Sequence, residues 1–315
     1  MENTTKALYT SLRMRFLEDP TLQIERWKVE DFRALSLDEL FSRLGEKDIT
    51  LDKARFIAYA NEYDTPEELT ETFVDEELEE ESDYIYLLVF ELWRRLVPEK
   101  QTITHIADEL DYQIFLYDTE AIDSVEALDD AIASVYEVLK ENVDHGALPK
   151  SAFFAIQEFC AHDILSFLYD YISQLIQARE LAFAAERIEE FYPFIPEKKW
   201  FDFLHAQIIG VHEPKQSLAA IGKIITTNRP DLLLNFDIME YLCGVNSLPL
   251  FCDVAKQTLS LLTEEEDLQE LMGVCSEYFS HHSREDAEKG IQAIKATGSF
   301  EEKKAALSQL ISNLQ

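Results

Sequence analysis

Glycine is scarce in this sequence of 315 residues, which contains only eight. That is about 2.5% of the chain against a usual ~7%, and it disfavours folds that depend on glycine turns or tight hairpins. The sequence has no Gly-x-Gly-x-x-Gly motif and no Gly-Lys-Ser/Thr motif. The common phosphate-cradling loops are therefore excluded, and nothing in the sequence alone names a specific activity.

Cysteine and long apolar runs are also rare. The four cysteines form no Cys-x-x-Cys pair and lie among apolar residues: Cys160, Cys243, Cys252 and Cys275. This pattern predicts buried, reduced thiols instead of a disulfide framework or a zinc site. No run reaches the ~18 apolar residues of a membrane helix, and the N-terminus has no signal-peptide apolar core. We expect a cytoplasmic protein without membrane insertion, while secretion by a route that uses no such signal stays open.

Basic residues are few, with 28 Lys and Arg against 62 Asp and Glu, a formal net charge of −34. Such a charge repels nucleic acids and anionic membranes, which bind clustered Lys and Arg. We therefore expect a partner protein with a basic surface and no direct binding of nucleic acid. The chain should nevertheless fold, because 47% of its residues are hydrophobic.

The deficit of bases is greatest in residues 56–139, which contain 24 acids and three bases. We call these residues the acidic span. A short charge run is usually a solvated helix end or loop, but exposed helices normally intersperse both signs of charge. We predict that the densest part faces solvent and contributes to binding a basic protein, through Glu76, Glu77, Glu79, Glu80, Glu81 and Asp83.

Helix-start signals recur along the chain. A hydroxyl three residues before a carboxylate, followed by a run of helical spacing, predicts capping boxes at Ser36–Glu39, Thr65–Glu68, Thr263–Glu266 and Ser299–Glu302. Apolar residues then return at three- and four-residue spacing, as in a helix. Residues 84–90 fit a buried helix, whereas residues 112–117 fit either a strand or a helix. We predict an all-α fold of roughly fourteen to seventeen helices.

The charge density changes near residues 145–149. Residues 1–150 contain 37 acids and 15 bases, and residues 151–315 contain 25 acids and 13 bases. We predict an acidic all-helical N-terminal region, 1–150, and a helical-repeat-like C-terminal region, 151–315. The two can also form one continuous array, because stacked helices need no separate cores.

From about residue 165 the predicted helices come in pairs that end at Pro196 and Pro230, 34 residues apart. The two pairs, over about residues 165–230, resemble tetratricopeptide units at Tyr171, Leu175, Ala184 and Ile188, and again at Leu204, Ile208, Ser217 and Ile221. The resemblance implies antiparallel helical hairpins stacked as a right-handed α-solenoid that binds proteins. Any bundle of helical hairpins gives a similar spacing, so that alternative stays open.

The resemblance also has departures. His205 and His212 stand where the family prefers glycine, and Ile224 replaces a small residue. The basic side chains of the family's peptide-carboxylate clamp are not evident, so no residue is assigned to it.

One pair of residues supports an enzymatic alternative. The adjacent His162 and Asp163 resemble the metal-binding pair of the all-helical HD phosphohydrolases. A phosphorylated substrate would need basic groups, yet no Lys or Arg lies between Lys150 and Arg179. The structural alternative is a helix start at which Asp163 is a cap.

These observations favour a non-catalytic scaffold or adaptor with an acidic surface and no cofactor. An anionic chaperone or nucleic-acid mimic is the alternative among binding proteins. A metal-dependent phosphohydrolase that uses His162 and Asp163 is the alternative among enzymes.

Overall fold

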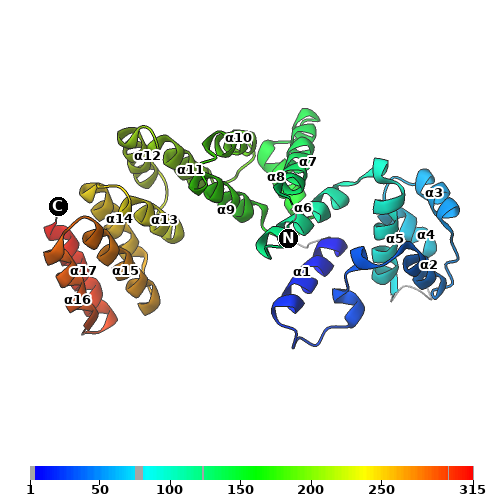
Figure 1. Cartoon of the computed structure of the whole chain (residues 1–315), viewed down its shortest axis with the longest axis horizontal. Helices are drawn as coiled ribbons and strands as arrows, with labels where there is room; N and C mark the ends of the chain where they lie inside the picture. The colour runs from blue at the N-terminus through cyan, green and yellow to red at the C-terminus, as the bar shows by residue number, and fades with distance from the viewer. Residues whose placement is uncertain (1–3, 75–80, 123, 297, 315) are drawn as a thin grey trace. The chain divides into compact units, whose positions relative to one another are not determined.

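The computed structural model describes the backbone of residues 4–74, 81–122, 124–296 and 298–314 (Figure 1). In these residues every regular element is helical, with seventeen α-helices, a few short 3-10 helices and no strand. The predicted all-α fold of helical hairpins is therefore confirmed.

The chain divides into two units. The N-terminal unit consists of Met1–Leu168 and Pro193–Ile195, and the C-terminal unit consists of Tyr169–Tyr192 and Pro196–Gln315. The division lies within a helix, beyond the change in charge density at residues 145–149, and the boundary at residue 150 stays a prediction.

In the N-terminal unit α2, α3 and α4 pack against α5, while α7 packs between α6 and α8, and the helices of the C-terminal unit form consecutive hairpins. The N-terminal unit contains α1 (Thr5–Glu18), η1 (Arg26–Val29), η2 (Phe32–Ala34), α2 (Leu37–Gly45), α3 (Lys53–Glu62), α4 (Pro66–Phe73), α5 (Ser82–Leu96), η4 (Pro98–Lys100), α6 (Ile103–Asp118), α7 (Val125–Asp144), α8 (Pro149–Gln157) and the start of α9 (Ile164–Gln177). The C-terminal unit continues with α10 (Leu181–Phe191), α11 (Lys199–Gly210), α12 (Pro214–Thr227), α13 (Leu232–Cys243), α14 (Leu248–Leu261), α15 (Glu265–His281), α16 (Glu285–Ala296) and α17 (Phe300–Asn313).

Capping explains where several helices begin. At α2 the Ser36 hydroxyl accepts from the Glu39 amide at 3.2 Å while the Glu39 carboxylate accepts from the Ser36 amide at 2.8 Å, which confirms this capping box. The box before α17 is confirmed in the same way. At α4 only half of the predicted box forms: the Thr65 hydroxyl accepts from the Glu68 amide at 3.2 Å, but the Glu68 carboxylate accepts from the amide of Asp64 instead of that of Thr65.

The capping box predicted at Thr263–Glu266 is wrong. Glu264 is the N-cap of α15, so the helix begins one residue later than the Thr263 signal predicts, and no side chain caps it. Three acids in its first turn take the place of a cap, because negative charge near a helix N-terminus interacts favourably with the helix dipole.

The helix α5 is deeply buried, and every residue from Ile85 to Trp93 belongs to its buried set. The indole of Trp93 donates a hydrogen bond to the carbonyl of Lys100 at 2.8 Å, so this large side chain is buried without an unpaired donor. The prediction of a buried helix over residues 84–90 is confirmed. Residues 112–117, for which the sequence left a strand open, lie in α6.

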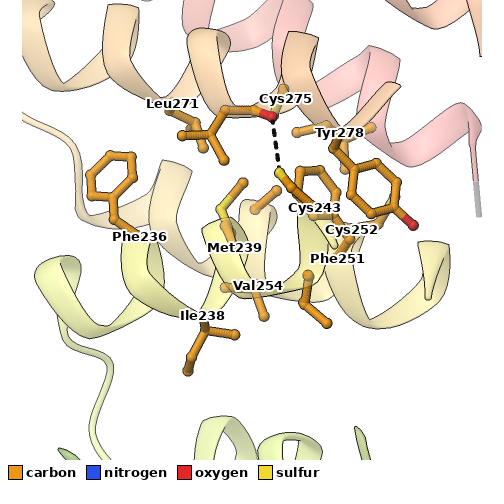
Figure 2. Close-up of a cluster of buried hydrophobic side chains, with 14 of the residues drawn as sticks. Phe236, Ile238, Met239, Cys243, Phe251, Cys252, Val254, Leu271, Cys275 and Tyr278 are labelled. Atoms are coloured by element: carbon orange, nitrogen blue, oxygen red, sulfur yellow. Dashed lines mark hydrogen bonds between the residues drawn. The ribbon is translucent and has the colours of Figure 1, made fainter. Parts of the chain in front are cut away.

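The core of the C-terminal unit gathers between α13, α14 and α15, where Figure 2 shows three of the four cysteines among apolar side chains. Burial raises the pKa of the Cys243 thiol to about 11. Cys243 donates a weak hydrogen bond to the carbonyl of Val274, with 3.9 Å between sulfur and oxygen. All four cysteines are buried free thiols, as predicted, and burial keeps them protonated and unreactive.

The α11–α12 hairpin packs on the α13–α14 hairpin helix against corresponding helix, whereas α14 contacts α15 and α17 further along the chain. The contacts join α11 to α13, α12 to α14 and α13 to α15. Ser217, expected to be the small residue where two helices approach closely, is fully buried, and its hydroxyl lies 3.0 Å from the hydroxyl of Tyr241. Stacking as a right-handed solenoid and the tetratricopeptide resemblance stay predictions.

Candidate functional site

Two of the six predicted acidic site residues can be located. Glu76, Glu77, Glu79 and Glu80 lie outside the described residues. Glu81 is the N-cap residue of α5 and Asp83 lies in its first turn. Both side chains line one hollow of about 590 Å³ in the N-terminal unit.

Three aromatic rings from different elements line this hollow. They belong to Tyr9 of α1, Trp27 of η1 and Tyr84 of α5. The ring centroids of Tyr9 and Trp27 are 5.3 Å apart, and those of Trp27 and Tyr84 are 5.4 Å apart with the planes inclined at 69°. These distances are those of aromatic pairs in direct contact, so the three rings form one continuous surface.

Carboxylates outnumber ammonium groups around these rings. Lys28 and Lys47 are the two basic residues that line the hollow, and the acidic residues are Glu25, Glu46, Glu81 and Asp83. We call the whole set the aromatic–acidic hollow. Its formal charge is −2 even with both lysines in place.

The charged groups of the hollow already contact one another and the rings. The Tyr9 hydroxyl donates to Asp83 at 2.7 Å, and burial together with this carboxylate raises the pKa of Tyr9, which keeps the hydroxyl protonated. Lys47 forms an ion pair with Glu81, and Lys28 lies 2.6 Å from a carboxylate oxygen of Glu25.

The position of Trp27 depends on the irregular segment between α1 and α2. Two arginines fix this segment. Two guanidinium nitrogens of Arg43 donate hydrogen bonds to the two carboxylate oxygens of Glu30, at 2.6 and 3.0 Å. Arg95 donates a hydrogen bond to the carbonyl of Leu35 at 2.7 Å. Bidentate guanidinium contacts restrict orientation as well as distance, so an irregular segment can hold an aromatic ring in place.

A second, smaller cavity of about 60 Å³ lies beside α1, α5 and α6, also in the N-terminal unit. Asp108 lies at its wall and is almost fully buried, in contact with the ammonium of Lys6 and with the guanidinium of Arg33 at 2.6 Å. Burial by itself raises the pKa of Asp108, but the two cations outweigh that effect and hold the pKa well below its usual value. Asp108 is thus an ionised structural group whose partners come from outside the acidic span.

Part of the acidic span does not face solvent. Besides Asp108, Glu91 is buried and accepts hydrogen bonds from Arg94 and Arg95. The buried Asp111 accepts from the backbone amides of Ala161 and His162, at 2.7 and 2.9 Å. These carboxylates are in the interior because each has a base or backbone donors to replace water.

His162 and Asp163, the predicted alternative metal site, make structural contacts. His162 Nδ1 lies 2.8 Å from Asp111, and Asp163 accepts from the backbone amide of Ser166 at 2.8 Å, as a helix N-cap does. Within the described part of the chain, no group of three His, Cys, Asp or Glu side chains is arranged to hold a metal ion.

Sequence reasoning missed the aromatic residues of the hollow. Tyr9 and Trp27 lie far outside the acidic span, and no motif connects them with Tyr84. Only the tertiary packing of α1 and η1 brings them to the N-terminus of α5, so the sequence contains no signal for this convergence.

Over the described residues, no helix combines the length and the apolar character needed to cross a bilayer. Comparison with models of protein families, with curated proteins and with solved structures finds no match to this chain.

Proposed function

We propose that this chain is a non-catalytic protein-binding module, and that the aromatic–acidic hollow is where its N-terminal unit binds a basic partner protein. The observation that carries the proposal is the convergence of four carboxylates on three contacting aromatic rings. Aromatic side chains at interfaces supply large contact area, and carboxylates at their edge select for positive charge.

The charge of the whole chain supports the same function. At −34, its field attracts a basic protein from beyond contact distance, although salt screens exposed charges over about 8 Å at physiological ionic strength. Such attraction raises the rate of encounter more than it slows dissociation. The hollow then supplies the specific contacts.

The other candidate functions have less support. An anionic chaperone or nucleic-acid mimic would use distributed charge, whereas the hollow combines charge with a local aromatic surface. A phosphohydrolase would need His162 and Asp163 to bind a metal, and both already contact other parts of the chain.

The proposal is tested by association kinetics with an oligolysine peptide at low and high salt. The test variant is Glu81→Gln/Asp83→Asn, which removes two charges from the hollow and leaves an amide that can still accept from Tyr9. The matched control is Glu126→Gln/Asp130→Asn, which removes two charges from exposed positions on α7 that do not line the hollow.

We expect the test variant to slow association by about fivefold at low salt, to converge with the wild type at high salt, and to exceed the effect of the control. Equal effects of the two variants would mean that total charge alone is responsible, and the hollow would not be the binding site. A third variant, with Gln at positions 76, 77, 79 and 80, tests separately the predicted acids that lie outside the described residues.

A further inference from the structure

We infer that the aromatic–acidic hollow receives one arginine side chain of the partner, against the faces of Trp27 and Tyr84. This inference rests on the proposed function and specifies its chemistry. The ligand is a guanidinium group on an exposed segment of a basic protein, and the groups that recognise it are two aromatic rings and the carboxylates around them.

The chain's own lysines indicate that these rings accept cations. The Lys28 ammonium lies 5.4 Å from the ring centroid of Trp27, and the Lys47 ammonium lies 5.8 Å from that of Tyr84. Both distances fall within the ~6 Å over which a ring attracts a cation electrostatically. Two separate cations therefore occupy the positions that a partner's cation would use.

These internal cations are held loosely enough to be replaced. The side chain of Lys28 is 33% exposed and that of its partner Glu25 is 65% exposed, and the corresponding values for Lys47 and Glu81 are 26% and 42%. Ion pairs with this much solvent contact add little net stability, because water and salt screen them and two long side chains must be ordered. An incoming cation can displace either ammonium at small cost.

Size and charge favour an arginine. A hollow of about 590 Å³ lies in the ~300–1,000 Å³ range of sites that bind small ligands, so it has room for one guanidinium side chain. A guanidinium is planar, stacks on aromatic rings and can donate two parallel hydrogen bonds to one carboxylate. An ammonium interacts with rings and carboxylates as a point charge, without this fixed geometry. Because four carboxylates face two lysines, the hollow keeps an excess of acceptors for these donors.

The neighbouring cavity is not an equivalent site. Its volume of about 60 Å³ is about a tenth of the 590 Å³ of the hollow, and Lys6 and Arg33 at its wall are engaged by the buried Asp108. A partner side chain would have to break that buried cluster to enter.

The test uses the full chain and two blocked pentapeptides, Gly-Gly-Arg-Gly-Gly and the same peptide with citrulline for arginine. Citrulline has nearly the shape of arginine but no charge. Titration calorimetry measures the affinity. The fluorescence of Trp27 reports whether the peptide binds at the hollow; Trp200→Phe removes a second tryptophan signal, and Trp93 is fully buried away from the peptide. We expect saturable binding of the arginine peptide and none of the citrulline peptide.

Two variants with opposite expected effects separate recognition from damage to the fold. Trp27→Leu removes a ring face and should weaken binding of the arginine peptide about tenfold. Lys28→Met/Lys47→Met removes the internal competitors and should tighten it about threefold. Glu126→Gln, on the exposed surface of α7, should leave the affinity unchanged.

Equal binding of the two peptides, or weaker binding after removal of the two lysines, would overturn the inference. If oligolysine association still depends on Glu81 and Asp83 while the arginine peptide does not bind, the proposed function stands and this inference fails. If neither probe depends on the hollow, both fail.

Discussion

The buried carboxylate of Asp108 gives the strongest test of how this fold uses its charges. Asp108 is 5% exposed and contacts Lys6 of α1 and Arg33 of η2, whose side chains are 19% and 15% exposed. One residue of α6 thereby joins two segments that lie far from it in the sequence. Loss of its charge leaves two cations close together with little access to water.

Replacement of Asp108 by Asn keeps the shape and removes the charge. Removal of one partner from a buried ion pair typically costs 3–5 kcal/mol, so we expect Asp108→Asn to lower the free energy of unfolding of the N-terminal unit by about 3 kcal/mol. The matched control is Glu109→Gln. Glu109 also pairs with Arg33, at 2.8 Å, but it is 41% exposed, and its loss should cost about 0.5 kcal/mol.

If the lost charge causes the destabilisation, a second result follows that a loss of packing would not give. Lys6→Met in the Asp108→Asn background removes one of the two facing cations, so the double variant should regain about 1 kcal/mol or more. The assay is urea unfolding followed by tryptophan fluorescence in a Trp200→Phe background, where Trp27 and Trp93 both report on the N-terminal unit. A loss for Asp108→Asn no larger than that for Glu109→Gln would refute the reasoning.

Two further predictions concern a close helix approach and a buried imidazole. A Cβ atom at Gly210 would lie 2.1 Å from the Tyr241 hydroxyl and 3.0 Å from that of Ser217, so Gly210→Ala should destabilise the C-terminal unit by about 1–2 kcal/mol in thermal unfolding. Tyr241→Phe removes the nearest atom, and a double variant as unstable as Gly210→Ala would contradict this explanation. The second prediction concerns His105, whose ring stacks on that of Phe90 with 4.2 Å between the centroids; burial lowers the pKa of His105 to about 4. Between pH 6.5 and pH 4 the His105 imidazole gains a proton in the unfolded chain but stays neutral in the folded one. The free energy of unfolding should therefore fall by up to about 3 kcal/mol as the pH drops through this range. Unfolding curves of wild type and His105→Gln across this pH range measure the difference, and parallel curves would exclude His105 as the cause.

The helical architecture could be predicted from the sequence because its signals are local. Ser36 and Glu39 form their capping box with neighbours three residues apart, and the apolar spacing that continues beyond Phe90 indicates a helix before any tertiary contact is known. The Thr263 signal gave a start one residue early, because three acids of the first turn stabilise that end without a hydroxyl cap.

The candidate site could be predicted only in part because its contacts are not local. Glu81 and Asp83 were identified from charge density, which a sequence displays directly. Tyr9 and Trp27 come from α1 and η1, and they reach the start of α5 through an irregular segment that arginines hold in place. Neither periodicity nor spacing encodes such a convergence.

The acidic span therefore has two physical roles that a count of charges cannot separate. Some of its carboxylates stabilise the fold, as Glu67 does when it accepts hydrogen bonds from Tyr86 at 2.8 Å and from Thr104 at 3.3 Å. Others, such as Glu81, remain partly exposed beside aromatic rings. A buried carboxylate such as Glu91 is out of reach of a partner, whereas a partly exposed carboxylate such as Glu81 can exchange its present cation for another. What distinguishes a structural acid from a candidate binding acid in this chain is thus the exposure of the carboxylate itself. Arg94 beside Glu91 and Lys47 beside Glu81 are about equally exposed, at 27% and 26%, but the two carboxylates are 3% and 42% exposed, so we expect a basic protein to bind at the hollow.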